Sequence, residues 1–217
     1  MNHKIKLIKK YANILFELAK IITAMPICFP IIFVLRLIKP IIHIRLCKIH
    51  TGELGHFVLD SGILLSEFVL RGNKNKIKDW YWLGTSEKWL WSSGKENYRY
   101  GEISNYKFKE LVERAFYVRW WVKYLYIANN IIPGGNQHYG KTPRETLQSR
   151  DMNGALYKTK ELKEAYFNFT EEEHAEAKKY LKDIGLNEGD KFVCLQVRDN
   201  AYKDSFLPAK KWSYHGF

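Results

Sequence analysis

A short apolar run near the end of the sequence places the tightest limit on the fold. The segment "FVCLQV", from Phe192 to Val197, is interrupted only by Gln196, and it stops at the charged pair Arg198 and Asp199. Near-continuous apolar runs of this length are typical of strands in sheets that are covered on both faces. We therefore predict a buried strand that ends on two charges.

The residues before this run predict a helix. Thr170 is a suitable N-cap, Glu173 stands at the capping-box position, and Gly185 follows the last apolar position of the helical pattern. The turn "NEGD" then leads into the strand. A helix followed by a buried strand is typical of an α/β fold, and we expect residues 161–217 to begin a second domain of this class.

An earlier α/β domain is expected in residues 41–160. "IIHIRLCKI" predicts a strand, "HTGELGHF" supplies a turn with two glycines, and "SGILLSEFVL" has helical spacing. "DWYWLGT" and "KWLWSS" predict two further short strands. The stretch from Lys107 to Ala128 predicts one long amphipathic helix, and the prolines and glycines that follow it predict a loop.

Residues 1–40 form a basic and apolar segment. Ile21 to Leu35 carries no charge, and basic residues flank it on both sides. As a helix it would be about 22 Å long, whereas the hydrocarbon core of a bilayer is about 30 Å thick. Pro26 and Pro30 are expected to kink or break such a helix.

Several structures of this segment are compatible with the sequence. A re-entrant or interfacial hairpin, with both ends on the cytoplasmic face of the cell membrane, suits the prolines and the basic flanks better than a single span. A secretory signal peptide is an alternative, but no small-residue cleavage site follows the apolar run. A buried helix of a soluble domain is a further alternative, which the many lysines disfavour.

Charge and composition limit the partners. The 217 residues carry a formal net charge of +12, which favours anionic partners such as lipid headgroups, phosphorylated small molecules or nucleic acid. No nucleic-acid signature accompanies the aromatic and basic mixture "YVRWWVKYLY", so we expect no nucleic-acid partner. Cys28, Cys47 and Cys194 are far apart and do not have zinc-ligand spacing, so we expect neither a metal site nor a disulfide framework.

The turn "HTGELGHF" is the first candidate site. Gly52 and Gly55 let the backbone approach a ligand, and the start of the following helix offers N–H groups to an anion. His56 can act as a general base on a hydroxyl, because imidazoles exchange protons near neutral pH. Asp60, four residues later, can orient His56 or serve as the base itself. A plain tight turn with a structural histidine is the alternative.

The charged end of the C-terminal strand is the second candidate site. Ligands of open α/β sheets gather at the carboxyl ends of the strands. Arg198 can bind a phosphate with two parallel hydrogen bonds, and Asp199 can hold Arg198, cap a helix or contact a sugar hydroxyl. Tyr202 and Lys203 are expected to line the same edge. The alternative is an Arg–Asp pair that only closes the strand.

These segments resemble a family of bacterial glycosyltransferases found with surface-polysaccharide synthesis genes. The resemblance is strongest in "FTEEEHAEAKKYLKDIGLNEGDKFVCLQVRDNAY", extends to "WSYH", and includes "GELGHFVLD", which looks like the glycine turn of that family. It covers roughly residues 44–217. It implies a GT-B architecture, in which two Rossmann-like domains face each other across a cleft. The first domain would bind mainly the acceptor and the second mainly the nucleotide-sugar.

The resemblance also implies an activity. A sugar would pass from a nucleotide-sugar, which is a substrate and not a cofactor, to a surface glycan or a lipid-linked acceptor at the anionic membrane surface. The strand-then-arginine pattern is similar to a motif of fucosyltransferase-like enzymes whose arginine binds the donor phosphates, which implies that role for Arg198. Such an enzyme does not require a metal in principle, because Arg198 and helix N-termini can stabilise the leaving diphosphate.

Two departures from the family pattern stand beside this resemblance. Gln196 replaces a histidine that is frequent in these motifs, and the sequence up to Phe217 contains only the start of a second domain. We therefore expect a truncated enzyme that lacks most of the donor site. The alternative is a non-catalytic fragment that binds a membrane surface or a partner protein.

Overall fold

The computed structural model describes residues 3–72, 76–84, 103–143, 145–146 and 151–193. The chain divides into two compact units. The first, here called the sheet unit, comprises residues 1–91 and 101–167, and the second, here called the α6 unit, comprises residues 92–100 and 168–217. The described residues are a mixture of helices and parallel strands, so the α/β class predicted from the sequence is confirmed.

In the described residues, three parallel strands form a sheet. They are β1 (His43–His50), β2 (Ile77–Gly84) and β3 (Tyr139–Gly140), in the order β2-β1-β3. The register places Leu46 of β1 opposite Trp80 of β2 and Tyr139 of β3. Helix α2 (Leu54–Arg71) connects β1 to β2. The sequence predicted a strand, a turn, a helix and a further strand in this region, and the parallel pairing of β1 with β2 makes them a βαβ unit.

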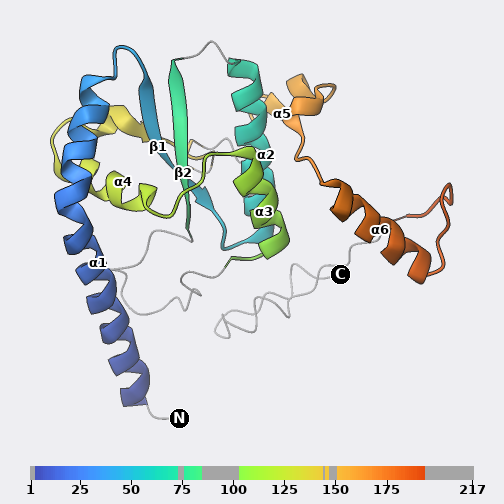
Figure 1. The fold of residues 1–217 in the computed structure, drawn as a ribbon, viewed down its shortest axis with the longest axis horizontal. Coiled ribbons are helices and arrows are strands. Elements are labelled where there is room, and N and C mark those ends of the chain that lie inside the picture. The colour runs from blue at the N-terminus through green and yellow to red at the C-terminus, as the bar shows by residue number, and fades with distance from the viewer. Residues whose placement is uncertain (1–2, 73–75, 85–102, 144, 147–150, 194–217) are drawn as a thin grey trace. The chain divides into compact units, whose positions relative to one another are not determined.

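Helices α1 (His3–Leu37) and α4 (Val122–Ile131) cover one face of this sheet (Figure 1). Ile44, Leu46 and Trp82 point from the strands into a buried apolar cluster on this face. The helices contribute Cys28, Ile32, Leu35, Val122, Tyr124, Leu125 and Ala128 to the same cluster. The C-terminal half of α1 is therefore part of the core of the sheet unit.

Helices α2 and α3 (Tyr106–Ala115) cover the opposite face (Figure 1). Cys47, Ile49 and Tyr81 point to this side, because successive side chains of a strand alternate between the two faces. They meet Phe57, Leu64, Leu65 and Val112 from the two helices. The strands are thus buried on both faces, which gives three layers, α/β/α.

Short elements also belong to the described part of the sheet unit. They are the 3₁₀ helices Gly135–His138 and Lys163–Ala165 and the helix α5 (Ala155–Thr159). The loop predicted after α4 begins as expected, because Gly134 has a φ of 82°, a conformation that glycine adopts at little cost. The strand β3 then follows from the first 3₁₀ helix and was not predicted.

The prediction of one long helix from Lys107 to Ala128 is wrong. Helix α3 ends at Ala115, α4 begins at Val122, and the residues between them run along the edge of β2. The N–H of Tyr81 donates to the carbonyl of Tyr117, and the N–H of Arg119 donates to the carbonyl of Tyr81, both at 2.9 Å. The exposed edge of β2 offers backbone partners that the helical pattern of the sequence does not reveal. The predicted strand in "KWLWSS" lies outside the described residues.

Helix α1 differs from the favoured hairpin, because it is continuous through Pro26 and Pro30. Each proline removes one backbone hydrogen bond. Packing of the buried side chains Cys28, Ile32 and Leu35 against the sheet and α4 holds the helix together across these positions. Leu15 to Leu37, with a mean hydropathy of 2.2, is long and apolar enough to cross a membrane by length and composition alone.

The α6 unit contains the helix that the sequence predicted most clearly. Helix α6 (Glu171–Asp183) begins at Thr170, whose hydroxyl accepts from the N–H of Glu173 at 3.2 Å, while Glu173 accepts from the N–H of Thr170 at 2.8 Å. The predicted capping box is confirmed. Phe192 and Val193, the first residues of the predicted buried strand, are exposed and outside any strand, and the rest of that strand lies outside the described residues.

Candidate functional site

The carboxyl end of β1 is held by backbone hydrogen bonds to two other segments. The N–H of Thr51 donates to the carbonyl of Gly84 at 3.2 Å, and the carbonyl of Thr51 accepts from the N–H of Ser104 at 2.9 Å. Thr51 is buried, and the chain turns from it into the first turn of α2. This edge, here called the carboxyl edge, is the place where open α/β sheets bind ligands.

His56 and Asp60 lie at this edge and face each other. Their positions in α2 are four residues apart, which places them on the same side of the helix. The Nδ1 atom of His56 is 3.8 Å from Oδ2 of Asp60, and its Nε2 atom is 3.6 Å from Oε2 of Glu53. These distances allow ion pairs with a protonated imidazole but exceed those of hydrogen bonds. The structure therefore brings together two residues that the sequence selected as a general base and its orienting group.

The side chains of His56 and Asp60 differ in their exposure to solvent. The side chain of Asp60 is 3% exposed, whereas that of His56 is 38% exposed. The carboxylate of Asp60 is shielded from solvent, whereas part of the imidazole of His56 is exposed. This arrangement suits a base that exchanges a proton with a substrate hydroxyl, with Asp60 as its positioning group.

The two predicted glycines lie in the same turn. A Cβ atom placed on Gly55 would have no heavy atom within 4 Å, and the backbone there does not adopt a positive φ. Packing therefore does not demand glycine at this position. Open space beside the first turn of α2 fits the predicted close approach of a ligand to the backbone. Gly52 lies in the bend before that helix.

Three further polar residues of this edge were not selected from the sequence. His50 is buried, and its ring lies 6.3 Å from that of His56 in an edge-to-face arrangement. The hydroxyls of Ser61 and Ser104 are buried and, among the described residues, have no hydrogen-bond partner. A polar residue at the last position of a strand is a signal that identifies His50. Ser61 and Ser104 carry no comparable signal in the sequence.

The second predicted site cannot be described in the same way. Arg198, Asp199, Tyr202 and Lys203 all lie outside the described residues. Their role in binding donor phosphates stays a prediction.

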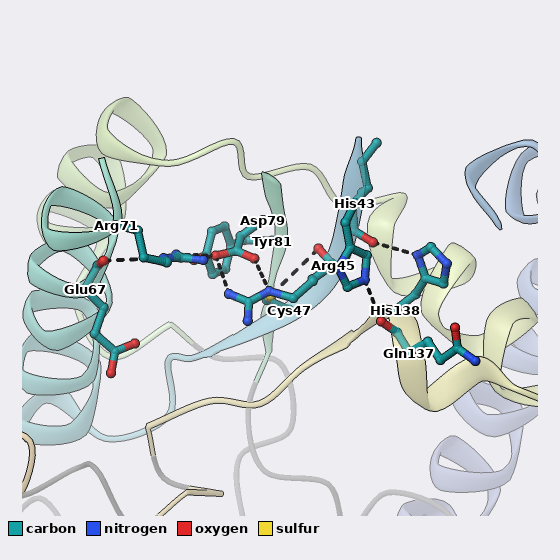
Figure 2. Close-up of polar contacts among 10 residues, drawn as sticks. His43, Arg45, Cys47, Glu67, Arg71, Asp79, Tyr81, Gln137 and His138 are labelled. Atoms are coloured by element: carbon teal, nitrogen blue, oxygen red, sulfur yellow. Dashed lines mark hydrogen bonds and ion pairs between the residues drawn. The ribbon is translucent and has the colours of Figure 1, made fainter. Parts of the chain in front are cut away.

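A charged cluster that the sequence analysis did not identify lies toward the opposite, amino end of the sheet. Arg45 of β1 donates from Nε to Oδ1 of Asp79 at 2.6 Å and from Nη2 to Oδ2 at 2.9 Å (Figure 2). Arg71, the last residue of α2, donates from Nη2 to the same Oδ2 at 2.5 Å. Two arginines from different elements thus share one carboxylate.

The electrostatics of this cluster follow from its burial. Burial alone would raise the pKa of Asp79, but the hydrogen bonds and charges of Arg45 and Arg71 outweigh it and hold that pKa below its ordinary value. Burial raises the pKa values of the neighbouring Cys47 thiol and Tyr81 hydroxyl. Both groups are therefore neutral at pH 7, and Asp79 carries the negative charge of the cluster.

Two histidines at the same end of the sheet have a structural role. Nδ1 of His138 donates to the carbonyl of Ile44 at 2.8 Å, and Nε2 of His43 donates to the carbonyl of Gln137 at 2.6 Å (Figure 2). Burial lowers the pKa of His138. These contacts attach the 3₁₀ helix before β3 to the central strand.

In the described part of the chain, His, Cys, Asp and Glu side chains do not form a group of three or more that could hold a metal ion. Comparisons with protein-family models, curated proteins and solved structures each found no match.

Proposed function

We propose that this chain is all or part of a membrane-associated glycosyltransferase, which transfers a sugar from a nucleotide-sugar to a surface glycan or a lipid-linked acceptor. The observation that supports it most directly is the pairing of His56 with Asp60 beside the turn after β1. The parallel α/β sheet, the net charge of +12 and the family resemblance of the sequence agree with this activity.

The proposed reaction uses His56 as the general base. The acceptor hydroxyl oxygen forms a bond to the anomeric carbon of the donor sugar, and the bond from that carbon to the diphosphate oxygen breaks. The hydroxyl proton passes to the imidazole of His56. The imidazolium so formed lies within 4 Å of the carboxylates of Asp60 and Glu53, which carry the opposite charge. The nucleoside diphosphate leaves, and Arg198 is the residue proposed to neutralise it.

A transfer assay tests this proposal. The full chain is incubated with bacterial membranes and a panel of nucleotide-sugars labelled in the sugar, and label in the lipid and polysaccharide fractions is counted. We expect transfer from at least one donor and a loss of about 10²- to 10⁴-fold in rate for His56→Asn, the usual contribution of a general base. Asp60→Asn is expected to lower the rate less, because His56 remains.

His174→Asn provides the matched control, because His174 is an exposed histidine of α6, in the other unit. Thermal unfolding of each variant separates loss of activity from loss of fold. Absence of transfer from every donor, or a rate for His56→Asn equal to that of His174→Asn, would contradict the proposal.

The membrane part of the proposal rests on α1. Its outward side carries large exposed apolar side chains, namely Ile22, Ile27, Phe33, Val34 and Leu37, and Ile41 follows the helix. The opposite side, with Ile32 and Leu35, packs on the sheet and α4. A helix with one side fixed to a folded sheet lies in the membrane interface and does not cross it, so we propose that α1 rests on the cytoplasmic leaflet.

The alternative function is a non-catalytic membrane-surface protein. The exposed apolar side of α1 favours it as much as it favours a membrane-bound enzyme. The two differ in donor binding: the enzyme binds a nucleotide-sugar saturably, whereas the alternative binds vesicles but no member of the donor panel.

A further inference from the structure

A pocket of about 320 Å³ lies beside the charged cluster at the amino end of the sheet. It is lined by Arg45, Glu67, Leu70, Arg71, Asn153, Ala155 and Lys158. Arg45 is near the start of β1 and Arg71 ends α2, whereas His56 lies in the first turns of α2. The pocket is therefore separate from the carboxyl edge and is not part of the proposed transfer site.

Both arginines of the pocket keep hydrogen-bond donors that Asp79 does not use. A guanidinium has five N–H donors. Arg45 uses Nε and Nη2 for Asp79, and Arg71 uses Nη2 for Asp79 and Nε for the carbonyl of Glu67. Within the described residues, neither Nη1 group makes a hydrogen bond. The side chains of Arg45 and Arg71 are 30% and 24% exposed, so these donors remain accessible from the pocket.

The buried carboxylate fixes the two guanidinium groups in place. Asp79 is 4% exposed, and it receives one hydrogen bond from Arg71 of α2 and two from Arg45 of β1 (Figure 2). Preorganised donors bind an anion better than flexible ones, because they lose less conformational freedom on binding. Asp79 thus fixes the two guanidinium groups without occupying all their donors.

Cations and carboxylates are balanced at the pocket when all of them are ionised. Arg45, Arg71 and Lys158 supply three cations, and Asp79, Glu67 and Asp151, whose carboxylate accepts from the N–H of Ala155 at 2.7 Å, supply three carboxylates. Figure 2 shows the carboxylate of Glu67 directed away from the guanidinium group of Arg71. Burial raises the pKa of Glu67, which weakens its opposition to an anion. The ammonium of Lys158 donates to the carbonyl of Asn153 at 2.9 Å and has two further N–H donors.

We propose that this pocket binds a phosphate group, held by the Nη1 groups of Arg45 and Arg71 and by the ammonium of Lys158. Arginine forks and lysine ammonium groups are the side chains that recognise phosphate oxygens. The volume is at the lower end of the range for ligand pockets and suits a phosphate with a small attached group. The group belongs either to a soluble phosphate ester or to a lipid headgroup.

Calorimetric titration of the full chain with inorganic phosphate, at constant ionic strength, tests the proposal. Lys158→Gln removes one cation and is expected to weaken binding about threefold or more, whereas Glu67→Gln removes the opposing carboxylate and is expected to strengthen it by a similar factor. Neither residue bonds to Asp79, so both variants retain the cluster. Lys163→Gln, the same charge change outside the pocket, is the control and leaves the affinity unchanged.

The proposal is overturned if phosphate does not bind saturably, or if all three variants bind it like the unchanged chain. Phosphatidylcholine vesicles with and without phosphatidic acid then identify the source of the group. A lipid headgroup predicts that Lys158→Gln weakens and Glu67→Gln strengthens binding to the phosphatidic acid vesicles. A soluble ester predicts that both variants bind those vesicles like Lys163→Gln. Both results retain a phosphate pocket and assign its ligand.

Discussion

The Nη2 group of Arg36 donates to the main-chain carbonyl of Asn129 at 3.1 Å and to its side-chain oxygen at 3.0 Å. The same guanidinium also bonds to the carbonyls of Ile132 and Pro133, at 3.1 and 2.7 Å. The last carbonyls of a helix lack partners within it and carry the negative end of its dipole. Arg36, in the last turn of α1, therefore satisfies the end of α4 and joins the two helices.

Replacing Arg36 is expected to loosen this joint. Arg36→Ala removes several charge-assisted hydrogen bonds to α4 and should lower the free energy of unfolding by about 2–3 kcal/mol. Urea denaturation followed by tryptophan fluorescence measures the loss, because Trp82 and Trp121 lie in or against the cluster between α1 and α4. Arg36→Lys keeps the positive charge but loses the several N–H donors of the guanidinium group. The stability of this variant should therefore lie between that of the unchanged chain and that of Arg36→Ala. Equal stability of all three chains would show that the joint contributes nothing.

Gly140 is expected to resist replacement because of its neighbour on β1. A Cβ atom at Gly140 would overlap the sulfur of Cys47, so Gly140→Ala forces either that side chain or the two strands to move. Overpacking of this kind costs about 1–3 kcal/mol in unfolding free energy. The double variant Cys47→Ala/Gly140→Ala removes the sulfur and should recover part of that loss. A double-mutant cycle by thermal unfolding tests it, and additive effects of the two changes would contradict the close contact.

The contribution of the ionised Asp79 to stability should be visible in how the stability of the chain changes with pH. Its pKa in the folded protein lies below the ordinary value of 3.8, so the folded state binds protons less readily than the unfolded state. Its stabilising contribution is complete above about pH 4 and is lost as the pH falls through the lower folded pKa. Asp79→Asn should therefore reduce stability by about 2 kcal/mol at pH 7, and the difference should shrink below pH 4. A difference that is constant from pH 7 to pH 2 would contradict the ion pairs.

The contribution of Glu67 to stability should depend on pH in the opposite direction to that of Asp79. Its pKa in the folded protein is raised by burial above the ordinary value of 4.5, so the ionised form is disfavoured in the fold. The stability that the protonated carboxyl group contributes to the folded state is present below pH 4.5. It is lost as the pH rises through the pKa of Glu67 in the folded protein. Glu67→Gln should therefore raise the melting temperature at pH 7 and have no effect at pH 4. A lower melting temperature at pH 7 would mean that the carboxylate stabilises the fold.

Membrane binding should depend on the outward side of α1. Phe33→Ser and Leu37→Ser each remove an exposed apolar side chain without disturbing the buried cluster. We expect each to weaken binding to anionic vesicles about 10-fold, the effect of withdrawing about 1.5 kcal/mol of apolar burial. Vesicle sedimentation measures it, with Tyr157→Ser, an exposed aromatic residue on α5, as control. Binding unchanged by the α1 variants would place the lipid contact elsewhere.

The parts of the fold that local patterns determine were predictable. The capping box of Thr170 and Glu173 and the strand of residues 43–50 appear in the structure because hydrogen bonds and alternation within a few residues specify them. Contacts between distant residues were not predictable. Val118 leaves the helical pattern to pair with Tyr81, and α1 runs unbroken through Pro26 because the sheet packs against it.

The same distinction applies to the sites. His56 and Asp60 are four residues apart in one helix, so the sequence alone predicts that they share a face. The charged cluster draws its residues from three elements, namely Arg45 of β1, Arg71 of α2 and Asp79 of β2. The parallel register of β1 and β2 places Arg45 opposite Asp79, and this register cannot be read from the sequence. A pocket built from several elements therefore becomes visible only in the folded chain.

The placement of α1 in the core has a consequence for synthesis. The helix is complete at Leu37, but its partner α4 begins only at Val122. At about 5–20 residues per second, roughly 4–17 s separate the two events. Throughout this interval Ile32 and Leu35 have no α4 to cover them, and the stretch of the helix from Ile21 to Leu35 carries no charge on any side. During this time a lipid surface or a chaperone can bind α1 before α4 does. The location of the N-terminal helix after synthesis therefore depends on which of these binds it first.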